Sequence, residues 1–179
     1  QNKNTEIRKR YDEIASFYFT MPIGVGDNMI AKAFDPKFGL GTSVNTFSRY
    51  NFFLLAGIEL ARFEVSDVSL VGNFNTANLG YLYGELKYKF VPLKNIAVNP
   101  KIAAGYTWLT QYSSEKNYGN TDGVAYTAGF SIDYRLIMRV RIFAGLNYRY
   151  TVLKMHTDPE YESFYSNPQL LNIVAGIKF

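Results

Sequence analysis

Apolar residues alternate with polar or small residues at a period of two along most of the chain from Ala15 onward. One register carries Leu54, Ile58 and Leu60, for example, while Glu59 lies in the other. A period of two is that of a β-strand with two different faces. Segments rich in β-branched and aromatic residues predict eight strands, at about 15–25, 38–47, 52–63, 79–90, 96–110, 124–135, 139–152 and 170–179.

The connections between these segments alternate in length. Those near 48–51, 92–95 and 135–138 are tight, whereas those at 26–37, 64–78, 111–123 and 153–168 are long and rich in Asn, Asp, Gly and Ser. The longest apolar run, 52–58, is too short for a membrane-spanning helix. The pattern predicts an all-β fold, an eight-stranded antiparallel up-and-down transmembrane β-barrel with short periplasmic turns and long extracellular loops.

Glycine positions indicate which face of the barrel points inward. Most strand glycines share the register of the charged residues, whereas only Gly80 and Gly84 share the apolar register. An eight-stranded barrel has just enough interior for side chains, so a face that mixes glycine with charged residues suits the lumen. The polar-register glycines are Gly24, Gly39, Gly41, Gly57, Gly105, Gly129, Gly145 and Gly176.

Aromatic residues of the apolar face gather near the two ends of the predicted strands, with Leu, Ile, Val and Ala between them. This order predicts a lipid-facing apolar band between two aromatic girdles. The short-turn girdle is Phe17, Phe52, Tyr88, Phe90, Tyr134 and Phe179, and the long-loop girdle is Phe38, Tyr106, Trp108, Tyr126, Tyr148 and Tyr150.

The final segment, Leu171, Ile173, Ala175, Ile177 and Phe179, alternates and stops on a terminal Phe. With the eight-strand layout and the Gly/Tyr-rich alternation, it resembles the small OmpA/OmpX-like outer-membrane barrels of Gram-negative bacteria. The resemblance covers residues 15–179. It implies contact with outer-membrane lipid and an insertion signal, Ile177 and Phe179, read by the barrel-insertion machinery, although Gly176 lies closer to the end than the usual glycine.

Residues 1–14 stand apart from the barrel, 15–179, and we expect a periplasmic extension, favouring a solvated segment over a docking one. The start at Gln1 with a polar stretch leads us to expect an exported protein whose signal peptide has been cleaved, placed in the outer membrane. Despite a pI near 9.1, the basic residues are spread along the chain, so no nucleic-acid partner is expected.

The inward register carries charges that must be paired or wet. We expect a lumen ion network of Glu59, Glu85, Lys101, Asp133, Arg141 and Arg149 that plugs the barrel. A surplus of positive residues near the short turns would suit anionic lipid headgroups; it comprises Arg49, Lys87, Lys89, Arg135, Arg139 and Lys178.

The last long loop contains the single histidine, His156, with Asp158 and Ser163 nearby, the raw material of a nucleophilic triad. It lacks the His-x-Ser arrangement of the barrel deacylases, and the chain has no GxSxG or HExxH motif, so we predict no catalytic residues, no metal and no cofactor. The same loop offers a contact surface or a lid over the barrel mouth; its residues are His156, Tyr161, Phe164 and Tyr165.

The sequence favours a non-enzymatic outer-membrane barrel with a plugged polar lumen. It would act as a structural or accessory subunit of a larger outer-membrane complex and contact its partner through its loops or its lipid-facing wall. A smooth wall patch at Thr42, Thr46, Gly80 and Gly84 is a candidate contact. The alternatives are a lipid-modifying enzyme that uses His156, and a narrow channel or small-ligand barrel.

Overall fold

A computed structural model describes residues 13–113, 116–137, 139–155 and 158–179, apart from the side chains of 116–118. Its elements are β1 (Ala15–Gly24), α2 (Met29–Ala33), β2 (Phe34–Arg49), β3 (Phe52–Val65), α3 (Val68–Val71), β4 (Thr76–Tyr88), β5 (Phe90–Leu93), β6 (Ile96–Ser113), β7 (Lys116–Arg135), β8 (Arg141–Leu153), α4 (Glu162–Ser166) and β9 (Gln169–Lys178). In the described residues, no helix has the length and apolar character to cross a membrane.

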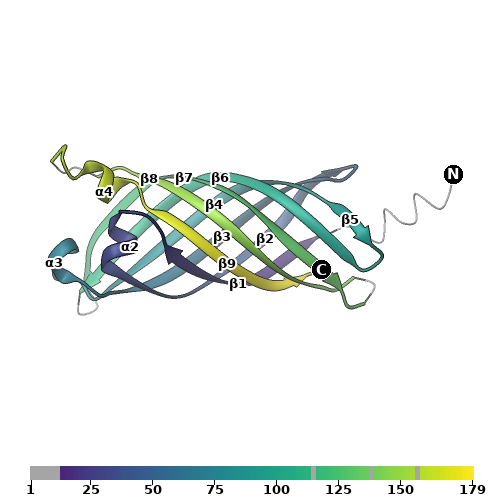
Figure 1. Ribbon diagram of the computed structural model, residues 1–179, viewed down its shortest axis with the longest axis horizontal. Coiled ribbons are helices and arrows are strands. Elements are labelled where there is room, and N and C mark those ends of the chain that lie inside the picture. Colours follow the sequence, from purple (N-terminus) through teal and green to yellow (C-terminus); the bar gives the residue numbers. More distant parts are fainter. Residues whose placement is uncertain (1–12, 114–115, 138, 156–157) are drawn as a thin grey trace.

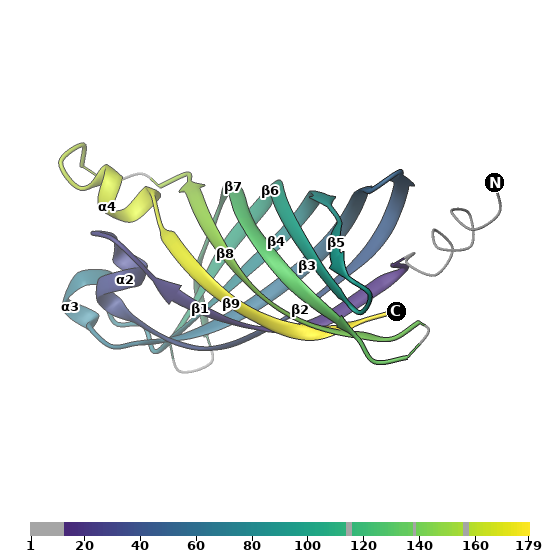
Figure 2. The ribbon, with the colours of Figure 1, turned by 45° about the vertical axis from the view of Figure 1, so that its right-hand side comes forward.

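The strands form one closed antiparallel sheet. Their order is β4-β3-β2-β1-β9-β8-β7-β6, and pairing of β4 with β6 closes the ring. Short β5 follows β4 after Lys89 and pairs with the start of β6, so it continues the wall of β4. The result is the eight-stranded up-and-down barrel that the sequence predicts, with strands that run obliquely around it (Figure 1, Figure 2).

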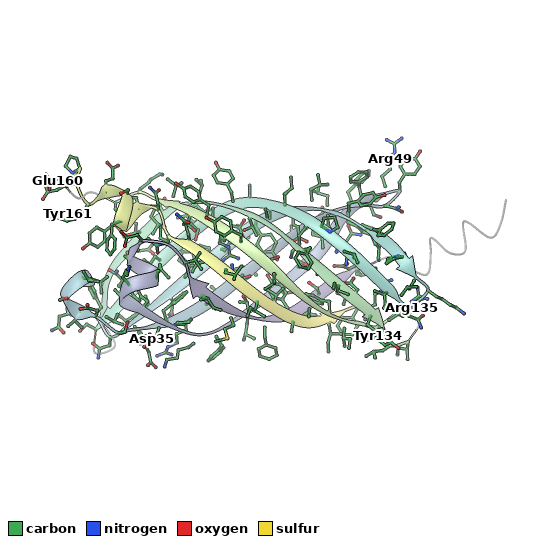
Figure 3. The ribbon with its side chains drawn as sticks, viewed as in Figure 1. Asp35, Arg49, Tyr134, Arg135, Glu160 and Tyr161 are labelled. Atoms are coloured by element: carbon green, nitrogen blue, oxygen red, sulfur yellow. The ribbon has the colours of Figure 1, made fainter. Side chains whose placement is uncertain are left out.

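The ends of the barrel differ. The helices α2, α3 and α4 lie together at one end, which we call the long-loop end, and β5 and the C-terminus lie at the short-turn end (Figure 1). In Figure 3, Glu160 and Tyr161 mark the long-loop end, and Arg49, Tyr134 and Arg135 mark the short-turn end. The alternation of burial, clearest in β3, puts one register inside and the other outside.

Some boundaries differ from the sequence prediction. The predicted loop 111–123 is mostly strand, because β6 runs to Ser113 and β7 starts at Lys116, and the two strands pair with a register shift between Gln111 and Tyr112. The predicted loop 26–37 contains α2 and the start of β2. Both segments are rich in polar residues, which indicate loops by composition but also suit strands that extend beyond an apolar band.

Of the predicted extension 1–14, residues 1–12 lie outside the described residues. The last two residues join the barrel: the Ile14 amide donates to the carbonyl of Phe179, and the Ile14 carbonyl accepts from the Asn45 amide. The first strand begins at Ala15, and these hydrogen bonds attach Ile14 to the same end of the sheet.

Candidate functional site

An apolar cluster lies inside the barrel at the long-loop end. Its centre is α2, whose Met29 and Ile30 are almost completely buried. Asn28 caps this short helix, because its Oδ1 accepts from the Ala31 amide at 3.2 Å and its Nδ2 donates to the Val25 carbonyl at 2.7 Å. The cluster also contains Ala33, Phe34, Ala61, Phe63, Ala77, Leu79, Leu109, Leu153 and Leu170.

Side chains from the other loops cover this cluster. Leu70 and Val71 of α3 pack against it, as do Phe164 and Tyr165 of α4. The Tyr165 hydroxyl donates to the Leu70 carbonyl at 2.6 Å and so joins the two helices. Phe164 and Tyr165 are therefore partly buried against this cluster, whereas Tyr161 is 55% exposed. His156 lies outside the described residues.

A charged and aromatic layer crosses the middle of the lumen. Arg149 of β8 donates from Nη2 to Oε1 of Glu59 on β3, at 2.9 Å. The Tyr18 hydroxyl donates to the other carboxylate oxygen at 3.1 Å and lies 2.8 Å from the Tyr83 hydroxyl. The guanidinium of Arg149 also lies 4.2 Å from the centre of the Tyr81 ring. The pair therefore has the hydrogen-bond partners that a buried ion pair needs.

Glycines in the same layer leave room for these rings. A Cβ at Gly41 would come within 2.2 Å of the Tyr18 ring, and one at Gly57 within 2.5 Å of the Tyr83 ring. Small residues on β2 and β3 thus accommodate large ones on β1 and β4. The glycines lie inside as the sequence predicts. The buried tyrosines Tyr81 and Tyr83 were not predicted, although they share the inward register of Glu85 on the same strand.

A lysine-rich layer occupies the short-turn end of the lumen. Lys178 Nζ lies 2.9 Å from Asp133 Oδ1, and Lys101 Nζ lies 3.0 Å from Glu85 Oε2. Lys87 Nζ contacts the carboxylate of Glu13, which is 1% exposed. A cavity of about 20 Å³ adjoins these groups, enough space for about one water molecule.

The predicted lumen charges all lie inside or partly inside the barrel, and four of them form two ion pairs. Glu59 pairs with Arg149, whereas Glu85 pairs with Lys101. The Tyr18 hydroxyl donates to Glu59 of the first pair, and Tyr18 and Tyr83 line a cavity together with Glu85 and Lys101 of the second. Arg141 is 4% exposed and so belongs to the buried charges as well.

Half of the predicted basic rim is internal. Lys87, Lys89 and Lys178 are each at most 4% exposed and point into the lumen, so they are not available to lipid headgroups. This corrects the expectation for these three lysines, because their register places them on the concave face. Arg49 and Arg139 are exposed, and Arg135 is partly buried.

The outer face carries both predicted girdles. At the short-turn end, the rings of Phe52 and Tyr88 meet with centres 5.0 Å apart, and those of Phe17 and Phe179 with centres 6.3 Å apart. Tyr134 and Phe90 are also exposed there. Ile177 and Phe179, the predicted insertion signal, point outward at the end of the chain.

The long-loop girdle follows the same face. The rings of Tyr106 and Trp108 stack at 5.9 Å, and Tyr126 pairs with Tyr150 across β7 and β8. Phe38 and Tyr148 are exposed as well. Gly80 lies under this girdle, because a Cβ there would come within 2.1 Å of the Trp108 ring. The glycine lets the indole lie flat against the wall.

An apolar groove of about 600 Å³ lies on the outer wall of β4, β6 and β7. Its floor is made of small residues. Gly84 on β4 pairs with Ala104 on β6, and Ala128 lies on the next strand, β7, where it pairs with Ile102. A Cβ at Gly84 would meet nothing within 4 Å. No lining residue is charged, and larger side chains frame the floor; they are Leu54, Leu86, Ile102, Tyr126, Tyr148 and Tyr150.

The predicted smooth patch is therefore only partly smooth. Gly84 belongs to the groove, but the Trp108 ring covers Gly80. Thr42 and Thr46 lie on β2, outside the groove, and their hydroxyls donate to the carbonyls of Ser16 and Leu54. The groove lies over β4, β6 and β7 rather than over β2 and β4, because Ala104 of β6 and Ala128 of β7 supply its other small residues.

The acidic residues of the last loop do not gather into a ligand set. Asp158, Glu160 and Glu162 are exposed. Over the part of the chain that the structure describes, no group of three or more His, Cys, Asp or Glu side chains could hold a metal ion. The described portion of this loop therefore contributes aromatic contacts to the mouth and an acidic outer surface.

Comparison with solved structures identifies the same architecture. Neisserial surface protein A matches with a TM-score of 0.66 over 92% of this chain and 94% of that one, at 9% identity. Ail, the attachment invasion locus protein of Yersinia pestis, gives a TM-score of 0.49 at 12% identity over 93% of this chain and 97% of that one. No protein-family model matches the sequence, and no curated protein matches it significantly. The chain thus has the fold of the small eight-stranded outer-membrane barrels, the class predicted from the sequence.

Proposed function

We propose that this protein is a non-enzymatic outer-membrane barrel, an accessory subunit whose lipid-facing wall receives an apolar segment of a larger membrane protein. The apolar band between two aromatic girdles supports placement in a bilayer. The closed barrel supports a membrane-spanning sheet, because lipid excludes open sheet edges. The similarity to small outer-membrane barrels supports a location in the outer membrane. The apolar cluster and the ion pairs inside the barrel support a lumen that does not conduct ions.

The observation that carries the proposal is the groove on β4, β6 and β7. Contact with fluid lipid does not require a groove that has small residues at its floor and large side chains around it. Close approach of another backbone, in contrast, needs small residues, as at helix interfaces inside membranes. The aromatic frame of Tyr126, Tyr148 and Tyr150 provides large contact areas on one side.

Charge favours a protein segment over a specific phospholipid as the occupant. A bound lipid headgroup would call for a cation beside the groove. No charged residue lines the hollow. Lys154, the residue after the end of β8, has its Nζ 3.5 Å from Oδ2 of Asp122 and is already paired. The Thr127 hydroxyl is directed into the lumen, where it accepts from Arg149 Nε at 3.4 Å.

Filling the groove tests the proposal. Gly84→Phe places a ring in open space, so the barrel should fold normally and release its partner. Ala175→Phe is the matched control, because Ala175 faces outward on β9, four positions from β4 in the strand order. Each variant is purified from outer membranes in mild detergent, its folding is checked by heat-modifiable gel mobility, and co-migrating protein is quantified.

A stoichiometric partner with wild type and Ala175→Phe, lost with Gly84→Phe, is the expected result. A partner retained by Gly84→Phe, or none with any form, would contradict the proposal. Two further measurements address the alternatives. Replacement of His156 by Ala should leave the host lipid profile unchanged, and the wild-type barrel should be silent in planar bilayers.

A further inference from the structure

Glu13 occupies an unusual position for a residue that precedes the first strand. Its carboxylate lies inside the lumen and is 1% exposed. It contacts Lys87 Nζ on β4 and lies 3.8 Å from Lys178 Nζ on β9. These lysines come from strands four positions apart in the ring. The carboxylate therefore links opposite walls of the barrel, although its own residue is outside the regular strands.

The charges around Glu13 show that it fills a cationic site. Lys178 has a second acidic partner in Asp133, and Glu85 is paired with Lys101. Lys87 is 1% exposed, and its ion-pair partner among the described residues is Glu13. An ammonium group buried without an anion is strongly unfavourable. The fold thus builds a site for one carboxylate group, and the N-terminal segment supplies that group.

The space around the site suits a small ligand. A cavity of about 20 Å³ adjoins Glu13, and the hydroxyls of Ser16 and Ser43 line it together with the lysines. If Glu13 were shortened to alanine, the vacated volume would be that of one methylene and one carboxylate group, the size of acetate. The hollow that remains beside Lys87 would therefore accept a two-carbon carboxylate but not a much larger anion.

We propose that Lys87 and Lys178 form a binding site for a small carboxylate at the short-turn end of the lumen, and that Glu13 is its built-in ligand. In the intact protein the N-terminal segment latches this end of the barrel through that contact. A free small carboxylate takes the place of the Glu13 side chain when it is removed. This inference is independent of the wall groove and of any partner.

Chemical rescue tests the site on the full-length protein in detergent. Glu13→Ala should lower the unfolding temperature, and acetate should raise it again in a saturable manner, at constant ionic strength set with chloride. Wild type should show no acetate-specific rise, because its site is filled. Benzoate, which is too large, should not replace acetate. Glu13→Ala combined with Lys87→Met should lose the acetate response.

Three outcomes would overturn the proposal. They are a Glu13→Ala variant as stable as wild type, an equal effect of acetate and chloride on the unfolding temperature of Glu13→Ala, and an acetate effect that persists in the double variant Glu13→Ala with Lys87→Met. Should Glu13→Ala fail to fold, Glu13→Gln keeps the volume and removes the charge. Labelling of Lys87 by an amine reagent, measured by mass spectrometry, should then be severalfold faster than in wild type. Equal labelling rates would also refute the latch.

Discussion

Arg149 reaches across the barrel to Glu59, with 2.9 Å between Nη2 and Oε1, and joins strands β8 and β3 on opposite sides of the ring. Both side chains are 3% exposed. Such a pair stabilises a fold only when its remaining hydrogen-bonding groups are satisfied. Here Tyr18 donates to the carboxylate, and the face of the Tyr81 ring lies against the guanidinium.

Removal of one member of this pair should be costly. Arg149→Met leaves the Glu59 carboxylate buried without its cation, and we expect a loss of about 3–5 kcal/mol in the free energy of unfolding. The double variant Glu59→Leu with Arg149→Met should regain much of that loss. Equilibrium urea unfolding in lipid vesicles measures both. An Arg149→Met variant as stable as wild type would show that the pair is not structural.

The apolar cluster at the long-loop end should respond to the loss of side-chain volume in α2. Ile30 is 1% exposed, and Ile30→Ala should lower the unfolding free energy by about 2–5 kcal/mol. Lys32→Ala on the same helix is the control, since its side chain is 55% exposed and its loss should change stability by less than about 0.5 kcal/mol. Equal effects of the two changes in urea unfolding would mean that α2 does not seal the mouth.

Trp108, the single tryptophan, provides a fluorescent probe of the outer wall. Gly80→Ala should displace the indole, because the new Cβ would lie 2.1 Å from the ring, and its quenching by brominated lipid should change. Gly84→Ala on the same strand adds the same atom to open space and should leave the emission and the quenching as they are. Identical spectra for all three proteins would rule out the described packing of Trp108 on Gly80.

The terminal residue should affect assembly more than stability. Phe179→Ala should reduce the fraction of folded barrel in the outer membrane of growing cells, because the resemblance to small outer-membrane barrels implies an insertion signal there. Phe17→Ala removes the same ring contact, at 6.3 Å between centres, but keeps the terminal aromatic. Heat-modifiable mobility of membrane fractions reports the folded share. Equal yields of the two variants would argue against a signal at Phe179.

The strands and their inward and outward faces were predictable because alternation fixes the register. Lys87 and Lys178 lie in the inward register of the sequence, and the structure buries both, so they do not form the exposed basic rim that their place near the short turns suggested. The partners of each charge could not be predicted, since Glu59 and Arg149 are 90 positions apart and meet only when the ring closes. The burial of α2 and of Glu13 inside the barrel depends on the space that the closed sheet leaves in its lumen. Alternation at a period of two carries no information about that space.

The most direct test of the proposed docking wall is a photo-crosslinking residue placed at Gly84 in living cells, with the same residue at Ala175 as the control. We predict one discrete protein adduct from position 84 and none from position 175. Identical adduct patterns from both positions, or adducts with lipid alone at position 84, would contradict a partner seated in the groove.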